Sequence, residues 1–208
     1  MSQGMRATLM IGACAITVAV AGCGSGAAVV TTASSPTPSP PSTSASTPVC
    51  ANPQVNSATA PVTQLALTVS DLPSSGPLLG QISDGEMNHT VNTDQRGFAN
   101  VANTYRIEDD VVLDASTQAA TADYPQLRDA AKTQFASITS TSSPATLGCQ
   151  ADAFTGKNAT GYSQVGIAFQ EGDVIAVVLV VNSAAPVDAA FAMAVAHAQD
   201  QKVDTAAS

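Results

Sequence analysis

The chain has 208 residues, with 16 acidic against 7 basic side chains and a formal net charge of −9 at pH 7. A surface for nucleic acid or anionic lipid headgroups needs the opposite sign, so this charge excludes nucleic acid as a partner. Residues 50–208 have the length of one domain with one hydrophobic core.

The first 22 residues have the pattern of a secretory signal. One basic residue, Arg6, precedes an apolar segment from Ala7 to Val20, and small residues follow it. A short apolar segment with a basic start and a small-residue end is typical of a cleaved signal peptide. We therefore expect residues 1–22 to be removed from the mature protein.

The end of this segment, Val20-Ala21-Gly22-Cys23, resembles the lipobox of bacterial lipoproteins. The resemblance implies cleavage before Cys23 and attachment of diacylglyceryl and palmitate chains to that residue. It also implies anchoring by lipid at the outer face of the cell membrane. After residue 22 no apolar run reaches the roughly 18 residues of a spanning helix.

Residues 23–49 form a tether in this interpretation. After the acylated cysteine the stretch is rich in Ser, Thr, Ala and Pro, with prolines at 36, 38, 40 and 41. Such a composition cannot bury enough apolar surface to offset the entropy of ordering. The sequence predicts a disordered linker followed by one domain, residues 50–208.

The four cysteines divide by position. Cys14 leaves with the signal and Cys23 carries lipid, so Cys50 and Cys149 remain in a chain delivered to an oxidising compartment. A Cys50–Cys149 disulfide is the expected pairing, and two free buried thiols are the alternative.

The first predicted element of the domain is a strand over Leu65–Val69, which alternates and is β-prone. It ends in a turn at Asp71-Leu72-Pro73, with Gly76-Pro77 beyond. The stretch LTVSDLPSSGP resembles the "DLP.G" segment of small actinobacterial envelope lipoproteins. The aromatic residue that follows in those proteins is replaced here by Pro77 and Leu78.

The next stretch, Gly80–Arg96, is polar and glycine-containing and is predicted to be an irregular loop. Strands are expected over Phe98–Ile107 and Val111–Ala115, with Glu108-Asp109-Asp110 as the turn between them. These three acids lack the alternating ligands, glycine and terminal glutamate of a calcium loop, so a solvated turn is the preferred interpretation.

Two helices and a hairpin complete the predicted elements. Apolar residues spaced at helical intervals predict a helix over 116–138, whose main part starts at Asp123 before Pro125, and a Ser/Thr loop follows it. Tyr162–Gln170 alternates, and Val174–Val181 is an unbroken apolar run typical of a central strand. A second helix is expected to start at Pro186.

Together these elements predict an α+β domain, with a mostly antiparallel sheet of about five strands and two helices packed on one face. The element order of strand pair, helix, hairpin and helix resembles the extracellular sensor domain of mycobacterial serine/threonine kinases.

No stretch of the chain carries a catalytic, phosphate-binding or metal motif. His89 lies in the polar loop and His197 near a helix end, and neither has a partner at a fixed spacing. We therefore assign no catalytic residue, no metal ligand and no cofactor. A ligand-facing surface is expected in the loops Gly80–Arg96 and Gly148–Gly161, which show no core pattern.

Three functions fit these observations. The first is a noncatalytic envelope lipoprotein that binds a small apolar ligand or an envelope protein. The second is a structural or accessory subunit without a ligand, and the third is a hydrolase whose site is not recognisable from sequence. An apolar pocket of more than about 300 Å³ would favour the first function.

Overall fold

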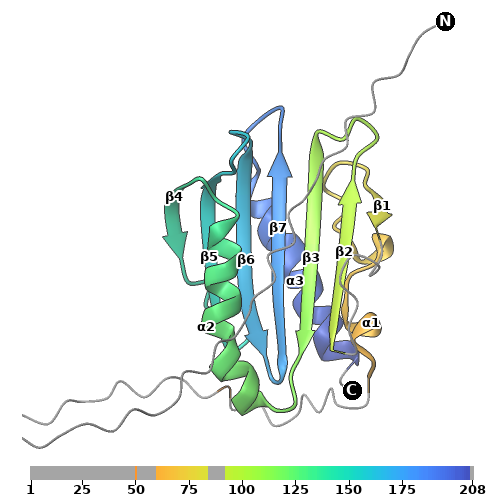
Figure 1. Ribbon diagram of the computed structural model, residues 1–208. Coiled ribbons are helices and arrows are strands. Elements are labelled where there is room, and N and C mark those ends of the chain that lie inside the picture. The colour runs from red at the N-terminus through yellow and green to blue at the C-terminus, as the bar shows by residue number, and fades with distance from the viewer. Residues whose placement is uncertain (1–49, 51–59, 84–91, 207–208) are drawn as a thin grey trace, which may run out of the picture. The chain divides into compact units, whose positions relative to one another are not determined.

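Seven antiparallel strands form one sheet in the order β1-β2-β3-β7-β6-β5-β4 (Figure 1). The computed structural model describes residue 50, residues 60–83 and residues 92–206, all within one compact unit. The expected α+β class and antiparallel sheet are confirmed, with seven strands among the described residues instead of about five. The strands are β1 Gly80–Ser83, β2 Thr93–Ala99, β3 Tyr105–Leu113, β4 Ser137–Ser142, β5 Gln150–Lys157, β6 Ser163–Glu171 and β7 Val174–Asn182.

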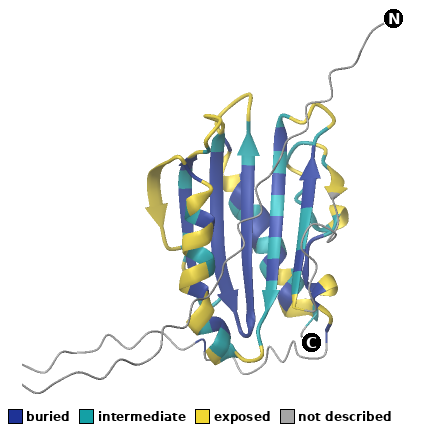
Figure 2. Ribbon diagram, in the orientation of Figure 1, coloured by how far each residue is buried: buried dark blue, intermediate teal, exposed yellow. Residues whose placement is uncertain are grey.

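Strand β7 is the centre of the domain, as its apolar run predicts. It pairs with β3 on one side and β6 on the other, and its residues from Val174 to Val180 are all buried (Figure 2). Its side chains alternate between two separate hydrophobic clusters, one for each face of the sheet. The core therefore has two layers with β7 between them.

The two long helices pack on opposite faces of this sheet. Helix α2, Thr117–Thr133, lies in front of β6 and β7 in Figure 1, and α3, Ala189–Ala206, lies behind them. The prediction of both helices on one face is therefore wrong. A sheet whose central strands are apolar on both sides exposes one apolar face unless each face has its own helix.

Helix α2 is capped by Ser116, seven residues before Asp123, where the sequence predicts the start of its main part. The Ser116 hydroxyl accepts a hydrogen bond from the Ala119 N–H at 3.1 Å and caps the helix, while Pro125 lies inside it. Asp123 is therefore an interior position and not the cap. The predicted end at residue 138 is also too late, because β4 begins at Ser137.

The expected strand at Leu65–Val69 is absent from the structure. A short helix α1, Val62–Leu65, and a 3₁₀ turn η2, Val69–Asp71, occupy this part of the chain. The Asp71 carboxylate accepts hydrogen bonds from the Thr68 N–H at 2.8 Å and the Thr68 hydroxyl at 2.6 Å. This capping arrangement closes the turn and diverts the chain from an extended path.

The turn expected at Glu108–Asp110 is instead the middle of β3. The reversal lies earlier, between Asn100 and Tyr105, where Asn103 adopts a φ of 54°. Asparagine tolerates this left-handed conformation better than most residues, so it supports a tight turn. The acidic residues then continue the strand, with Asp109 on the buried face and Asp110 on the other.

Two further stretches predicted as loops are strands. The Ser/Thr run contains β4, which forms an edge of the sheet and is exposed at every position (Figure 2). Most of the Gly148–Gly161 stretch is β5, and the Gly80–Arg96 stretch contains β1 and the start of β2. Because no position of the edge strand β4 is buried, its sequence has no strand-like alternation of apolar residues.

Candidate ligand-binding hollow

The segment 60–72, which contains α1 and η2, is held on the α3 side of the sheet by buried polar contacts. The Arg96 guanidinium on β2 donates hydrogen bonds to the carbonyl groups of Thr63 at 2.5 Å, Ala66 at 3.4 Å and Leu67 at 2.8 Å. The same group forms an ion pair at 3.0 Å with Asp94, whose side chain is 2 % exposed. A planar guanidinium with five donors suits this set of acceptors.

Asp109 lies directly opposite Arg96 in the pairing of β2 and β3. Its side chain is fully buried, and its Oδ2 accepts the Leu67 N–H at 2.9 Å. Its Oδ1 has no hydrogen-bond partner among the described residues. Burial raises the pKa of Asp109 to about 7, and the neighbouring charges of Asp110 and Asp94 add to the increase while Arg96 opposes it.

Helix α3 holds the segment from the other side. The fully buried Gln199 donates from Nε2 to the Leu65 carbonyl at 2.7 Å. Val62, Leu65 and Val203 share a small apolar cluster beside this contact. The segment 60–72 is thus fixed between the sheet and the C-terminal half of α3.

A surface hollow of about 430 Å³ lies where this segment meets α3. Five polar side chains and two alanines line it, namely Gln64, Asp71, Ala198, Gln201, Lys202, Thr205 and Ala206. Its volume lies within the roughly 300 to 1,000 Å³ of known small-molecule sites. The lining is about half polar, so it does not match the predominantly apolar pocket that would favour an apolar ligand.

An ion pair between Asp71 and Lys202 is the charged feature of the hollow. Lys202 Nζ lies 2.7 Å from Asp71 Oδ2, and each side chain is about one-quarter exposed. Partial burial acts to raise the pKa of Asp71, but hydrogen bonds from Lys202 and Thr68 outweigh it and lower the pKa below its usual value. The hollow therefore presents an anion and a cation side by side within reach of solvent.

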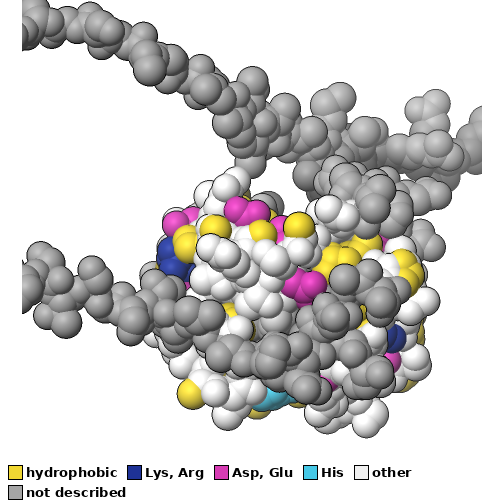
Figure 3. All heavy atoms as spheres, turned by 90° about the horizontal axis from the view of Figure 1, so that it is seen from below, with side chains coloured by type: hydrophobic (Ala, Val, Ile, Leu, Met, Phe, Trp, Pro, Cys, Tyr) yellow, Lys and Arg dark blue, Asp and Glu magenta, His cyan; other side chains and the backbone are white. Residues whose placement is uncertain are grey.

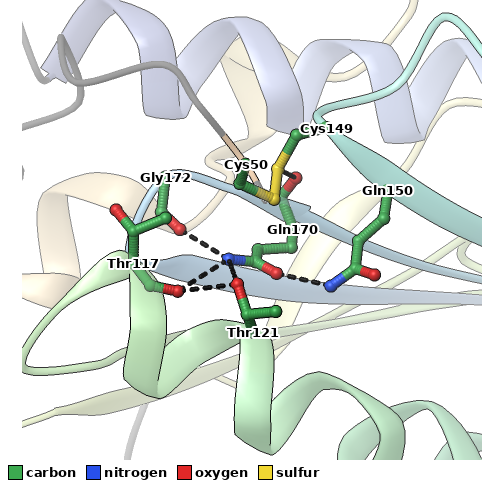
Figure 4. Close-up of a disulfide and its surroundings, with 7 residues drawn as sticks. All are labelled: Cys50, Thr117, Thr121, Cys149, Gln150, Gln170 and Gly172. Atoms are coloured by element: carbon green, nitrogen blue, oxygen red, sulfur yellow. Dashed lines mark hydrogen bonds between the residues drawn. A yellow bond between two sulfur atoms is a disulfide. The ribbon is translucent and has the colours of Figure 1, made fainter. Parts of the chain in front are cut away.

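The expected Cys50–Cys149 disulfide is present, with the two Cα atoms 5.1 Å apart (Figure 4). Beside it the buried Gln170 donates from Nε2 to the carbonyl of Gly172 at 2.8 Å and that of Thr117 at 3.3 Å. Its Oε1 accepts from Gln150 at 2.5 Å. The disulfide and this amide cluster join residue 50, the start of α2 and the strands β5 and β6, so the arrangement is structural.

Acidic residues gather at the end of the domain that carries the β6–β7 turn, and Figure 3 shows acidic side chains at several places on this end. Burial raises the pKa of Asp114, with added contributions from Asp123 and Asp173. Among the described residues, no group of three side chains is placed to hold a metal ion. We therefore assign no metal site to the described residues at this end.

Of the other residues that the sequence analysis singled out, the structure describes His197. Cys23, the tether and His89 lie outside the described residues. His197 lies on α3, where its Nε2 is 3.4 Å from the Thr146 hydroxyl, a contact that joins α3 to the loop before β5. No helix in the described part of the chain is long and apolar enough to cross a membrane.

Sequence reasoning missed the residues that build the hollow and hold its wall. One signal was present for Asp109, because alternate residues Tyr105, Ile107, Asp109, Val111 and Leu113 place it on an apolar face. An acid at such a position indicates a buried polar contact. Lys202 and Gln199 carry no comparable signal, because they lie in four consecutive polar residues, Gln199–Lys202, in which sequence does not distinguish buried from exposed positions.

Comparison with known proteins identifies no relative. No protein-family model matches the chain, and no curated protein or solved structure shows significant similarity to it.

Proposed function

We propose that this protein is a lipid-anchored, extracytoplasmic binding protein without catalytic activity, and that its ligand occupies the hollow between α1, η2 and α3. The observation that carries the proposal is the Asp71–Lys202 pair, partly exposed in a hollow of about 430 Å³. A few polar groups converging in a concave site are typical of ligand recognition.

The lining indicates the class of ligand. Lys202 can receive a carboxylate, and Asp71 can accept a hydrogen bond from an ammonium or hydroxyl group. Gln64, Gln201 and Thr205 add neutral donors and acceptors. This chemistry suits a small polar molecule or the charged end of a partner's chain, in place of the small apolar ligand expected from sequence.

Two independent features support the proposed extracytoplasmic location of the protein. The signal-like segment 1–22 ends at Cys23, and the disulfide Cys50–Cys149 is of the kind that persists in oxidising compartments. The disulfide favours export to an oxidising compartment, and the sequence pattern at Cys23 favours attachment to the membrane by lipid.

The test is mass spectrometry of the small molecules and proteins that copurify with the full-length, detergent-extracted protein. Gln201→Trp places a large side chain in the hollow, and Gln126→Trp makes the same change at an exposed position on α2, which packs on the opposite face of the sheet. The ligand should copurify with the wild type and with Gln126→Trp and fall at least tenfold with Gln201→Trp. Equal recovery from all three proteins, or no ligand from any, contradicts the proposal.

A structural or accessory role is the second candidate. Two large apolar side chains near the β1 edge favour it, Leu78 at 93 % and Ile82 at 55 % exposure. Exposed apolar groups on a sheet edge are typical of a contact with another protein. Loss of cross-linked adducts in Leu78→Ser/Ile82→Thr, together with their retention in Gln201→Trp, would favour this role over ligand binding.

A further inference from the structure

The polar cluster under the 60–72 segment contains more negative than positive charge. The cation of this cluster is Arg96, which is 13 % exposed, forms an ion pair with Asp94 and donates to three carbonyl groups. Asp109 lies opposite Arg96 in the pairing of β2 and β3, and its hydrogen bond is with the Leu67 N–H. With both carboxylates ionised, the cluster holds one uncompensated negative charge away from water, which is costly.

Among the residues that the structure describes, no cation other than Arg96 faces Asp109 from the elements packed around it. On β7 its paired residue is Val178, and on α3 the buried polar group that reaches the 60–72 segment, at the Leu65 carbonyl, is the neutral amide of Gln199. On its own strand Asp110 is a second acid, and the Lys202 ammonium is paired with Asp71 at the hollow. The free oxygen Oδ1 is therefore the atom at which a proton relieves the excess charge.

We propose that docking of the 60–72 segment is controlled by a proton on Asp109, so that the segment is held tightly when this carboxyl is neutral and loosens when it ionises. The neutral carboxyl keeps one oxygen to accept the Leu67 N–H, so protonation removes the charge and leaves this hydrogen bond in place. Because Gln64 and Asp71 belong to the segment and line the hollow, the same proton determines how firmly one wall of the hollow is held.

The direction follows from proton linkage. The docked carboxyl has a pKa of about 7, above its ordinary value of 3.8, and it returns to that ordinary value when undocking exposes it to water. The docked form therefore binds the proton more tightly, and raising the pH from about 4 to about 7 favours undocking. Above pH 7 both forms are ionised and the effect levels off. This inference does not require that the hollow binds a ligand.

Hydrogen exchange of the full-length protein in detergent tests it, read in a peptide covering residues 60–72 and corrected for the intrinsic pH dependence of exchange. The opening constant should rise by up to about tenfold per pH unit between pH 5 and 7 and then level off. Asp109→Asn, which is isosteric and neutral, should remove this dependence and keep the segment protected. Asp110→Asn is the matched control, because that carboxyl is adjacent, lies on the other face and also has a pKa raised by burial to about 7. It should retain the dependence, with the levelling pH moved lower, because the Asp110 charge also raises the pKa of Asp109.

A second variant distinguishes charge control from a general loss of structure. Asp94→Asn leaves Asp109 as the one carboxylate beside Arg96, so the pH at which the opening constant levels off should move to a lower value. A flat profile in the wild type, an unchanged slope in Asp109→Asn, or an unchanged levelling pH in Asp94→Asn overturns the proposal. Ligand recovery from the Gln201→Trp protein is independent of these readouts, so the two proposals fail separately.

Discussion

At the scale of single residues, Arg96 connects two parts of the molecule that lie about 30 residues apart in sequence. It joins β2 to the backbone of the 60–72 segment and neutralises the buried Asp94. A charged group in this position is stabilising only as long as all of its partners are present. Removing it leaves a buried carboxylate and several carbonyl groups without their donor.

Arg96→Met should therefore lower the free energy of unfolding by about 3 kcal/mol, the loss typical of breaking a buried ion pair. Arg128→Met is the control, because Arg128 pairs with Asp129, which is 58 % exposed, and at 3.7 Å with Asp152, which is 27 % exposed. Ion pairs within reach of solvent contribute about 1 kcal/mol or less. Urea unfolding of both variants measures the difference. Equal losses would show that the Arg96 contacts contribute no more than a surface pair.

At the scale of elements, the domain depends on contacts that fix short segments to the central strands. The disulfide is one of these, since it joins Cys50 to the loop before β5 across 99 residues of sequence. Gly148, with a φ of 50°, lies against the Gln170 backbone beside it, where a side chain would collide with the carbonyl oxygen. The start of the domain is thereby attached to its core and not only to the segment that follows it.

Replacing both cysteines by serine, Cys50→Ser/Cys149→Ser, should destabilise the domain by roughly 4 kcal/mol, because a cross-link closing a loop of this length restricts the unfolded chain strongly. Thermal unfolding with and without a thiol reductant measures the effect. The reductant should lower the melting temperature of the wild type and leave that of the double variant unchanged. A wild-type melting temperature insensitive to complete reduction would contradict this account.

At the scale of the whole molecule, the proposed lipid anchor and the folded domain are separate features joined by residues 23–49. The anchor assignment depends on Cys23, which lies outside the described residues. It therefore needs a test of its own that does not depend on the fold.

Cys23→Ala should abolish acylation and leave a precursor that retains residues 1–22, because the cysteine thiol is the lipid acceptor in the proposed processing. Intact mass measurement of the membrane fraction shows both changes. Cys14→Ala is the matched control within the signal segment and should be acylated and cut normally. A Cys23→Ala protein that is cut at the same bond and still partitions into detergent would rule out the lipobox interpretation.

Local pattern was sufficient for several elements of this protein. The unbroken run of β7, the alternation of β6 and the apolar positions of α3 each predict an element, because the burial of neighbouring positions follows the period of the backbone. The disulfide followed from counting the cysteines of a chain that its sequence predicts to be exported. These features depend on residue types that are close in sequence or few in number.

Three features depend on the tertiary structure alone. These are the packing of α2 and α3 on opposite faces of the sheet, the path of β3 through its acidic residues, and the position of the candidate site. Asp109 is accommodated in a strand because Leu67, 42 positions away, donates to it, and Gln199 is buried because it reaches Leu65 across 134 positions. Strand β4 is exposed at every position, so its sequence shows no alternation of apolar and polar residues from which a strand could be predicted. The hollow likewise forms where η2 meets a helix more than a hundred residues later, so its Asp71–Lys202 pair exists only once the chain has folded.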